Sequence, residues 1–201
     1  MGNESTGAPP RATPSINDAD RVQWTAADGA AATIRPIRPS DRTLEQEFVD
    51  GLSRRTSYQR LLSARHLSAE EIRRFTEVDG NREFALIATT RHQEREREIG
   101  VARYVKEPSD AAEFAIVLSD DWQGRGLGRR LLGELMAAAR RGGVLRLYGT
   151  TLSENTAMIA LAQSLGFVVM TDRDDATMMN MTLDLGASEP THARARPDRR
   201  R

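Results

Sequence analysis

Cysteine is absent from the 201 residues of this sequence. The chain can therefore form no disulfide bond and no thiolate metal site, as is typical of cytoplasmic proteins. The absence also excludes a covalent acyl-cysteine intermediate, so any acyl transfer must be direct or use another nucleophile. The three histidines, His66, His92 and His192, are too scattered to predict a metal site.

Lysine is almost absent as well, because Lys106 is the single lysine among 29 basic residues. The acidic residues also number 29, and the formal net charge is zero. This balance argues against a protein dedicated to nucleic acid or to a membrane surface. No apolar run approaches the roughly 20 residues that cross a bilayer, and the polar N-terminus lacks the apolar core of a secretory signal. We expect a cytoplasmic protein.

Hydrophobic residues make up 39% of the chain, enough for one folded domain with tails. Residues 1–21 are rich in small polar residues and are expected to be a disordered tail. Residues 187–201 are rich in arginine and are also expected to be disordered. A solvated basic end is the favoured interpretation there, and a nucleic-acid-binding arm is the weaker alternative.

Residues 22–186 alternate between strand and helix patterns, which predicts one α/β domain of the α+β type. An Asp28-Gly29 turn predicts a hairpin, and Ser68 with Glu71 predicts a capping box. The charged segment 91–98 is predicted to be a turn. The predicted strands are 33–38, 84–89, 99–105, 113–119, 144–151, 167–170 and 179–185, and the predicted helices begin near residues 40, 69, 127 and 157.

The glycine-rich segment 123–128 lies between a predicted strand and a predicted helix. Glycine lets the backbone approach a ligand closely, and a helix start attracts anions. Arg125, Arg129 and Arg130 can add charge-assisted bonds to phosphate. A dinucleotide fingerprint would need its third glycine one residue later than Gly128, and a P-loop would need a lysine. A loop that only connects the two elements remains an alternative on these residues alone.

The spacing Gln123-x-x-Gly126-x-Gly128 resembles the Q/R-x-x-G-x-G/A signature of the GNAT superfamily of N-acetyltransferases. Downstream, Asn155, Ala157 and the Leu-Gly-Phe of 165–167 resemble the second CoA-contacting element of that superfamily. The order of predicted elements agrees over residues 22–186. The resemblance implies a central mixed, mostly antiparallel twisted sheet flanked by helices.

Two further segments, 33–41 and 112–115, resemble the catalytic domain of Pat-type bacterial protein lysine acetyltransferases. The resemblance implies acetyl-CoA as co-substrate. Its pyrophosphate would sit on the backbone amides of 123–128, its pantetheine arm would pair with 116–118, and the Leu118 N–H would polarise the thioester carbonyl. Asn155 would contact the pantetheine or order the second helix. The implied acyl-CoA-binding residues are Ile116, Val117, Leu118, Gln123, Gly124, Arg125, Gly126, Leu127, Gly128, Arg129 and Asn155.

Glu113 is the candidate general base. The acceptor amine must be neutral, and a lysine ammonium has a pKa of about 10.4, so a base is needed directly or through water. Glu113 stands where Pat-like enzymes carry a glutamate, ten positions before Gln123. Asp120 and Asp121 are weaker candidates and are expected to be ordinary turn carboxylates.

Ala162 stands where many GNAT enzymes carry a tyrosine that protonates the departing thiolate. A thiol has a pKa of about 8.5 and leaves easily, so transfer does not require that tyrosine. Tyr148 is an alternative acid, although a strand tyrosine more often packs. We expect an acetyl-CoA-dependent N-acetyltransferase acting directly on a primary amine, in the first place a protein lysine. The alternatives are a small-molecule amine acetyltransferase and a non-catalytic acyl-CoA sensor.

Overall fold

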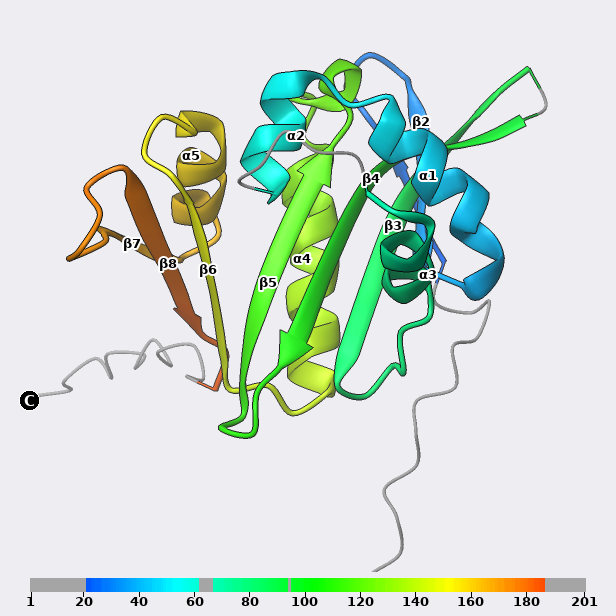
Figure 1. Cartoon of the computed structure of the whole chain (residues 1–201). Helices are drawn as coiled ribbons and strands as arrows, with labels where there is room; N and C mark the ends of the chain where they lie inside the picture. Colours follow the sequence, from blue (N-terminus) through cyan, green and yellow to red (C-terminus); the bar gives the residue numbers. More distant parts are fainter. Residues whose placement is uncertain (1–20, 62–66, 94, 187–201) are drawn as a thin grey trace, which may run out of the picture.

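The computed structural model describes residues 21–61, 67–93 and 95–186, so the predicted tails lie outside it apart from Arg21. The described strands form one eight-stranded sheet in the order β1-β2-β3-β4-β5-β6-β8-β7 (Figure 1). All neighbouring pairs in it are antiparallel except β5 and β6. The strands are β1 (Val22–Thr25), β2 (Ala31–Pro36), β3 (Glu83–His92), β4 (Arg95–Lys106), β5 (Ala111–Leu118), β6 (Arg146–Leu152), β7 (Val168–Thr171) and β8 (Met178–Asp184).

Helices lie on both faces of the sheet (Figure 1). One buried cluster joins α1 and α3 to one face of β3–β5, and the other joins α4 to the opposite face. The helices are α1 (Arg42–Asp50), α2 (Arg54–Leu61), α3 (Ala69–Thr76), α4 (Leu127–Arg141) and α5 (Thr156–Ser164), with short 3-10 turns η2 (Pro39–Asp41) and η3 (Asp120–Trp122). None of these described helices is long and apolar enough to cross a membrane.

The local signals of the sequence account for several of these elements. The repeat of Leu127, Leu131, Leu135 and Ala139 faces the core, and all four side chains are fully buried on α4. The Ser68 hydroxyl accepts a hydrogen bond from the backbone of the third residue of α3, as the predicted capping box requires. The predicted α+β class is confirmed.

One local prediction was wrong, and one helix was not predicted. Residues 91–98 are largely paired strand rather than turn, because β3 continues to His92 and β4 begins at Arg95, with Thr90 opposite Arg97. The exposed Arg91, Arg95 and Arg97 suit a ribbon that extends past the core. Helix α2 was not predicted, because it carries no apolar stripe, although the Ser53 hydroxyl accepts a hydrogen bond from Thr56 N at its start.

The two sides of β5 differ in how far they are paired. Toward β4 the ladder runs over seven residue pairs, from Gly100–Leu118 to Lys106–Ala112. Toward β6 only three parallel pairs form, and the last joins Glu113 to Tyr148. Beyond that pair β6 continues with β8 alone, so β5 and β6 separate (Figure 1). The fold therefore contains an opening inside the sheet.

Candidate active site

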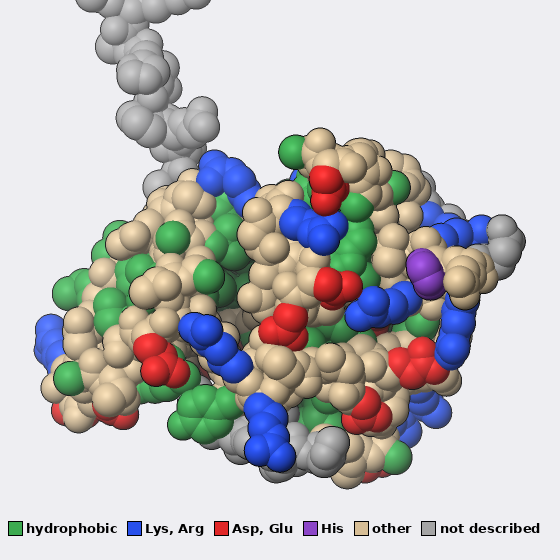
Figure 2. All heavy atoms as spheres, turned by 90° about the horizontal axis from the view of Figure 1, so that it is seen from above, with side chains coloured by type: hydrophobic (Ala, Val, Ile, Leu, Met, Phe, Trp, Pro, Cys, Tyr) green, Lys and Arg blue, Asp and Glu red, His purple; other side chains and the backbone are tan. Residues whose placement is uncertain are grey.

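A cavity of about 500 Å³ occupies the opening between β5 and β6. Seen from above, this end of the molecule is hollowed between its two lobes (Figure 2). Successive side chains of a strand point to opposite faces, and β5 contributes residues of both faces to the cavity wall. Toward α1 these are Glu113, Ala115 and Val117, and toward α4 they are Phe114, Ile116 and Leu118. The cavity therefore passes through the sheet.

The glycine-rich loop lies at the wide end of this cavity. Gly124 and Gly126 have φ of +72° and +91°, a region that favours glycine. A Cβ atom at Gly124 would have nothing within 4 Å, so the space beside the backbone is open. Gly126 precedes the first turn of α4 and caps it with no side-chain hydrogen bond.

Backbone donors of this loop are available to a ligand. The first intrahelical bond of α4 is from Arg130 N to Gly126 O, at 3.2 Å. Among the residues that the structure describes, none accepts a hydrogen bond from the N–H groups of 124–129. Unpaired donors at a helix N-terminus form an anion site. The loop therefore fits the pyrophosphate of a coenzyme A.

The three arginines predicted to bind phosphate point to different places, and Arg130 pairs with Glu134 of the same helix at 2.8 Å. Arg129 lines the cavity wall, and its Nη1 donates to Ser164 Oγ at 2.8 Å. The Arg125 guanidinium instead pairs with Asp28 at 2.9 Å and lies 5.3 Å from the Trp122 ring centroid. The side chains of Arg125 and the fully buried Leu127 are not part of the cavity wall, so inside the cavity these two residues offer only their backbone N–H groups.

The free edge of β5 also presents backbone donors. In an antiparallel ladder alternate residues bond to the same neighbour, and Ser119 N donates to Ile99 O at 3.0 Å. The N–H groups of Ile116 and Leu118 therefore point away from β4, into the opening. The Leu118 carbonyl accepts from Gln123 Nε2 at 3.2 Å. This edge can pair with an extended ligand as another strand would.

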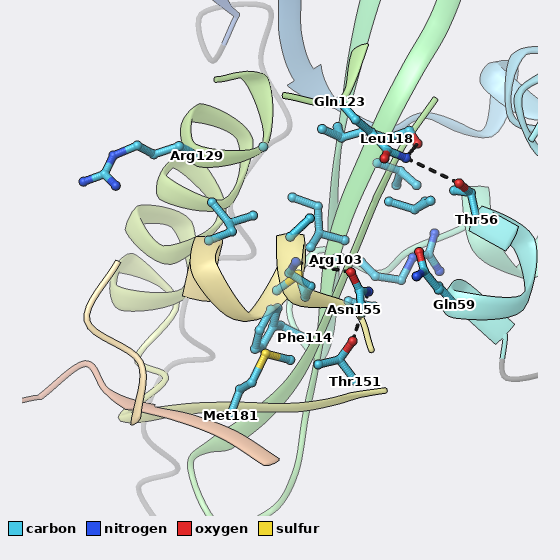
Figure 3. Close-up of a pocket in the computed structure, with 18 of the residues that line it drawn as sticks. Thr56, Gln59, Arg103, Phe114, Leu118, Gln123, Arg129, Thr151, Asn155 and Met181 are labelled. Carbon is cyan, nitrogen blue, oxygen red and sulfur yellow. Dashed lines mark hydrogen bonds between the residues drawn. The ribbon is translucent and has the colours of Figure 1, made fainter. Parts of the chain in front are cut away.

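Helix α2 forms a wall that sequence reasoning missed, with Thr56 and Gln59 along one side of the cavity (Figure 3). Asp120 connects it to the end of β5, accepting from Ser53 Oγ and Thr56 Oγ1, both at 2.8 Å. Burial alone would raise the pKa of Asp120, but these hydrogen bonds outweigh it and lower the pKa. Asp120 is therefore more than a turn carboxylate, since it holds α2 in place.

The opposite wall is organised by Asn155. Its Oδ1 accepts from Met158 N at 3.2 Å, which caps α5, and its Nδ2 donates to Thr151 Oγ1 on β6 at 3.1 Å (Figure 3). Asn155 also lines the cavity. Its side chain thus orders α5, which is one of the two roles expected for it. The other expected role, contact with the pantetheine, would also be possible from this position on the cavity wall.

Glu113 lies at the closed end of the opening and is exposed on the face that carries α2. Arg103 of β4 lines the same cavity, stacked over Phe75 with its guanidinium carbon 4.4 Å from the ring centroid. Arg103 had no motif to mark it in the sequence. Its place on the wall follows only from the pairing of β4 with β5.

The candidate general acid, Tyr148, does not line the cavity, and neither does Ala162, which stands at the position of the missing tyrosine. Ala162 is fully buried in the core. The Tyr148 hydroxyl donates a hydrogen bond to Glu107. That bond, with smaller contributions from burial and from the negative charges of Glu107 and Glu113, raises the pKa of Tyr148 to about 12. Tyr148 is not part of the cavity wall.

The sequence is similar to those of known acetyltransferases. Residues 32–168 match the acetyltransferase (GNAT) domain family. An acetyltransferase of Pseudomonas aeruginosa is 33% identical over 154 residues, which cover 76% of this chain and 83% of that protein. The acetyltransferase Pat of Mycolicibacterium smegmatis is 34% identical over 162 residues, which cover 76% of this chain and 45% of that protein.

The fold agrees with these matches. The GNAT domain of S. lividans PAT superposes with a TM-score of 0.75 at 26% identity, covering 84% of this chain and 98% of that domain. The chain therefore belongs to the GNAT acetyltransferase family and is related to the GNAT domains of Pat-type acetyltransferases. It is an acyltransferase, and enzymes of this family use acetyl-CoA.

Proposed function

We propose that this enzyme transfers the acetyl group of acetyl-CoA directly to a primary amine, and that the acceptor is the side chain of a protein lysine. The observation that carries the proposal is the cavity through the sheet, with an anion-binding loop at its wide end and the exposed carboxylate of Glu113 at its closed end. The relation to Pat-type domains supports a protein acceptor.

The donor would be held mainly by backbone atoms. The N–H groups of 124–129 suit a pyrophosphate, and Arg129 adds positive charge beside them. The free N–H groups of Ile116 and Leu118 suit the amides of an extended pantetheine arm. When bound, acetyl-CoA supplies an activated thioester for the amine to attack.

Strand geometry assigns the N–H groups of Ile116 and Leu118 to different parts of acetyl-CoA. A strand rises about 3.3 Å per residue, so Leu118 lies about 16 Å from Glu113 along β5 and Ile116 about 10 Å. Only the nearer N–H can polarise a carbonyl whose attacking amine is within reach of the Glu113 carboxylate, directly or through one water. Ile116 is therefore the better oxyanion donor, and Leu118 is left to contact the pantetheine.

Glu113 would act as general base. It removes the proton that the amine must lose when its nitrogen bonds to the acetyl carbon and the carbon–sulfur bond breaks. A protonated side chain is not needed to complete the reaction, because a thiolate is a good leaving group with a thiol pKa of about 8.5. The positions of Ala162 and Tyr148 outside the cavity agree with such a mechanism.

The first experiment is calorimetric titration of the full chain with acetyl-CoA. Gly126→Glu places a side chain at φ +91° and a negative charge at the anion site, which should weaken binding by more than about a hundredfold. Gly143→Glu is the matched control: it has φ +79° and open space, but lies beyond the other end of α4. The proposal fails if the unaltered protein does not bind acetyl-CoA.

The acceptor is tested separately by incubation with acetyl-CoA and either a mixture of lysine-containing proteins or a panel of small amines. Mass spectrometry should find acetyl-lysine on protein. Acetylation confined to small amines would overturn the proposed acceptor and keep the chemistry. Tight binding with no transfer to any amine would instead favour an acyl-CoA sensor.

A further inference from the structure

The closed end of the cavity is built from packed apolar side chains. Phe114 follows Glu113, the last residue of β5 that pairs with β6. The residue is 5% exposed and lies on the face that carries α4. Met181 of β8 is 2% exposed, and both side chains line the cavity. Figure 3 shows them together at the end opposite Gln123 and Leu118.

The Phe114 ring is fixed from two sides. Its centroid lies 4.9 Å from that of Phe167, within the buried core. On β6, a Cβ atom at Gly149 would come within 3.0 Å of Phe114 Cε1 and of Phe114 O. The absence of a side chain at Gly149 thus lets the ring lie across β6. A packed core of this kind resists displacement of the ring.

An acyl chain bound in this cavity would point toward that end. If the thioester carbonyl lies at Ile116 N–H and the amine at Glu113, the carbons beyond the carbonyl approach the next residue that borders the gap, which is Phe114. We propose that Phe114, supported by Met181, closes the acyl-binding end of the cavity and favours short acyl groups over long ones. This inference rests on the proposed function, because it assigns the acyl specificity of the same site.

The test is a calorimetric series with acetyl-, propionyl-, butyryl- and hexanoyl-CoA, which requires no knowledge of the acceptor. In the unaltered protein, affinity should fall by at least about tenfold between propionyl- and hexanoyl-CoA, the scale expected for methylenes that do not fit a pocket. Phe114→Ala should bind hexanoyl-CoA at least about tenfold more tightly than the unaltered protein does, without a gain for acetyl-CoA.

Phe48→Ala is the matched control for loss of a buried ring. Phe48 is also 5% exposed, but it belongs to α1 and to the other buried cluster, away from the cavity wall. It should lose stability without changing the order of acyl-CoA affinities. If Phe114→Ala does not fold, Phe114→Leu and Met181→Ala remove less volume from the same wall and should shift the series in the same direction.

Two results would overturn the inference. One is equal affinity of the unaltered protein for acetyl- and hexanoyl-CoA. The other is an order of acyl-CoA affinities that is the same in the folded Phe114 and Met181 variants as in Phe48→Ala. Failure of the proposed function looks different, because then no acyl-CoA of any length binds the unaltered protein.

Discussion

The two edges of β5 show how this molecule makes a site out of a sheet. Toward β4, antiparallel pairing continues over seven residue pairs and the surrounding side chains form two buried clusters. Toward β6, pairing stops after three. Unpaired backbone groups inside a protein are costly, so an interior edge that is left open at Ile116 and Leu118 indicates a place for a ligand that completes the ladder. The closed edge contributes stability, and the open edge is where we propose that the pantetheine arm binds.

Separate interactions hold the open edge apart. On the side of β5, Asp120 joins the strand end to α2 through Ser53 and Thr56. On the side of β6, Asn155 joins α5 to Thr151. Neither interaction crosses the gap. Each wall can therefore be altered alone.

The largest effect is expected at Glu113, where the closed part of the β5–β6 ladder meets the open part. Glu113→Gln keeps the size of the side chain and removes the base, so kcat should fall by about 10² to 10⁴ while acetyl-CoA affinity stays unchanged. Steady-state kinetics and calorimetry measure the two quantities. Unchanged turnover would remove Glu113 from the mechanism.

A smaller effect is expected for the β6 wall. Asn155→Ala removes the cap of α5 and the bond to Thr151, which should cost about 1 kcal/mol of unfolding free energy and weaken acetyl-CoA binding. Asn155→Asp is the control, because its carboxylate can still cap the helix. The measurement is denaturant unfolding. An unfolding free energy lower for Asn155→Asp than for Asn155→Ala would contradict a capping role.

The α2 wall should respond to pH. The pKa of Asp120 is lowered in the folded protein, so its contribution to stability is complete above the unfolded value of about 3.9 and is lost as the pH falls through the folded value. Asp120→Asn should remove that part of the dependence of Tm on pH below about 5. The effect is modest because Asp120 is exposed. Asp121→Asn is the control: Asp121 pairs with Arg97, at 3.4 Å, so this variant should keep the dependence of Tm on pH.

The smallest effect is expected at Tyr148, which faces Glu113 across the last pair of the ladder. Its hydroxyl bonds to Glu107, and its pKa of about 12 keeps it protonated far above neutral pH. Tyr148→Phe should leave kcat within about twofold, as for a residue that supplies no proton to the thiolate. The measurement is kcat as a function of pH. A tenfold or larger fall in kcat would restore Tyr148 as the general acid.

Short-range patterns predicted much of the fold. The leucine repeat of α4 and the cap of α3 depend on residues within a few positions of each other, so they can be read without knowledge of distant contacts. The polar helix α2 and the charged ends of β3 and β4 were missed because neither has an apolar face. Packing and pairing with distant residues, rather than local pattern, stabilise them.

The sequence by itself determined the loop 123–128 and the strand before it, because glycines with positive φ and a helix start act through their own backbone. Only the tertiary structure decided which side chains surround that loop. It turned Arg125 toward Asp28, placed Gln59 and Arg103 on the cavity wall, and ended the β5–β6 ladder at Glu113. These outcomes depend on contacts between residues far apart in the chain, and no local pattern encodes where two strands separate.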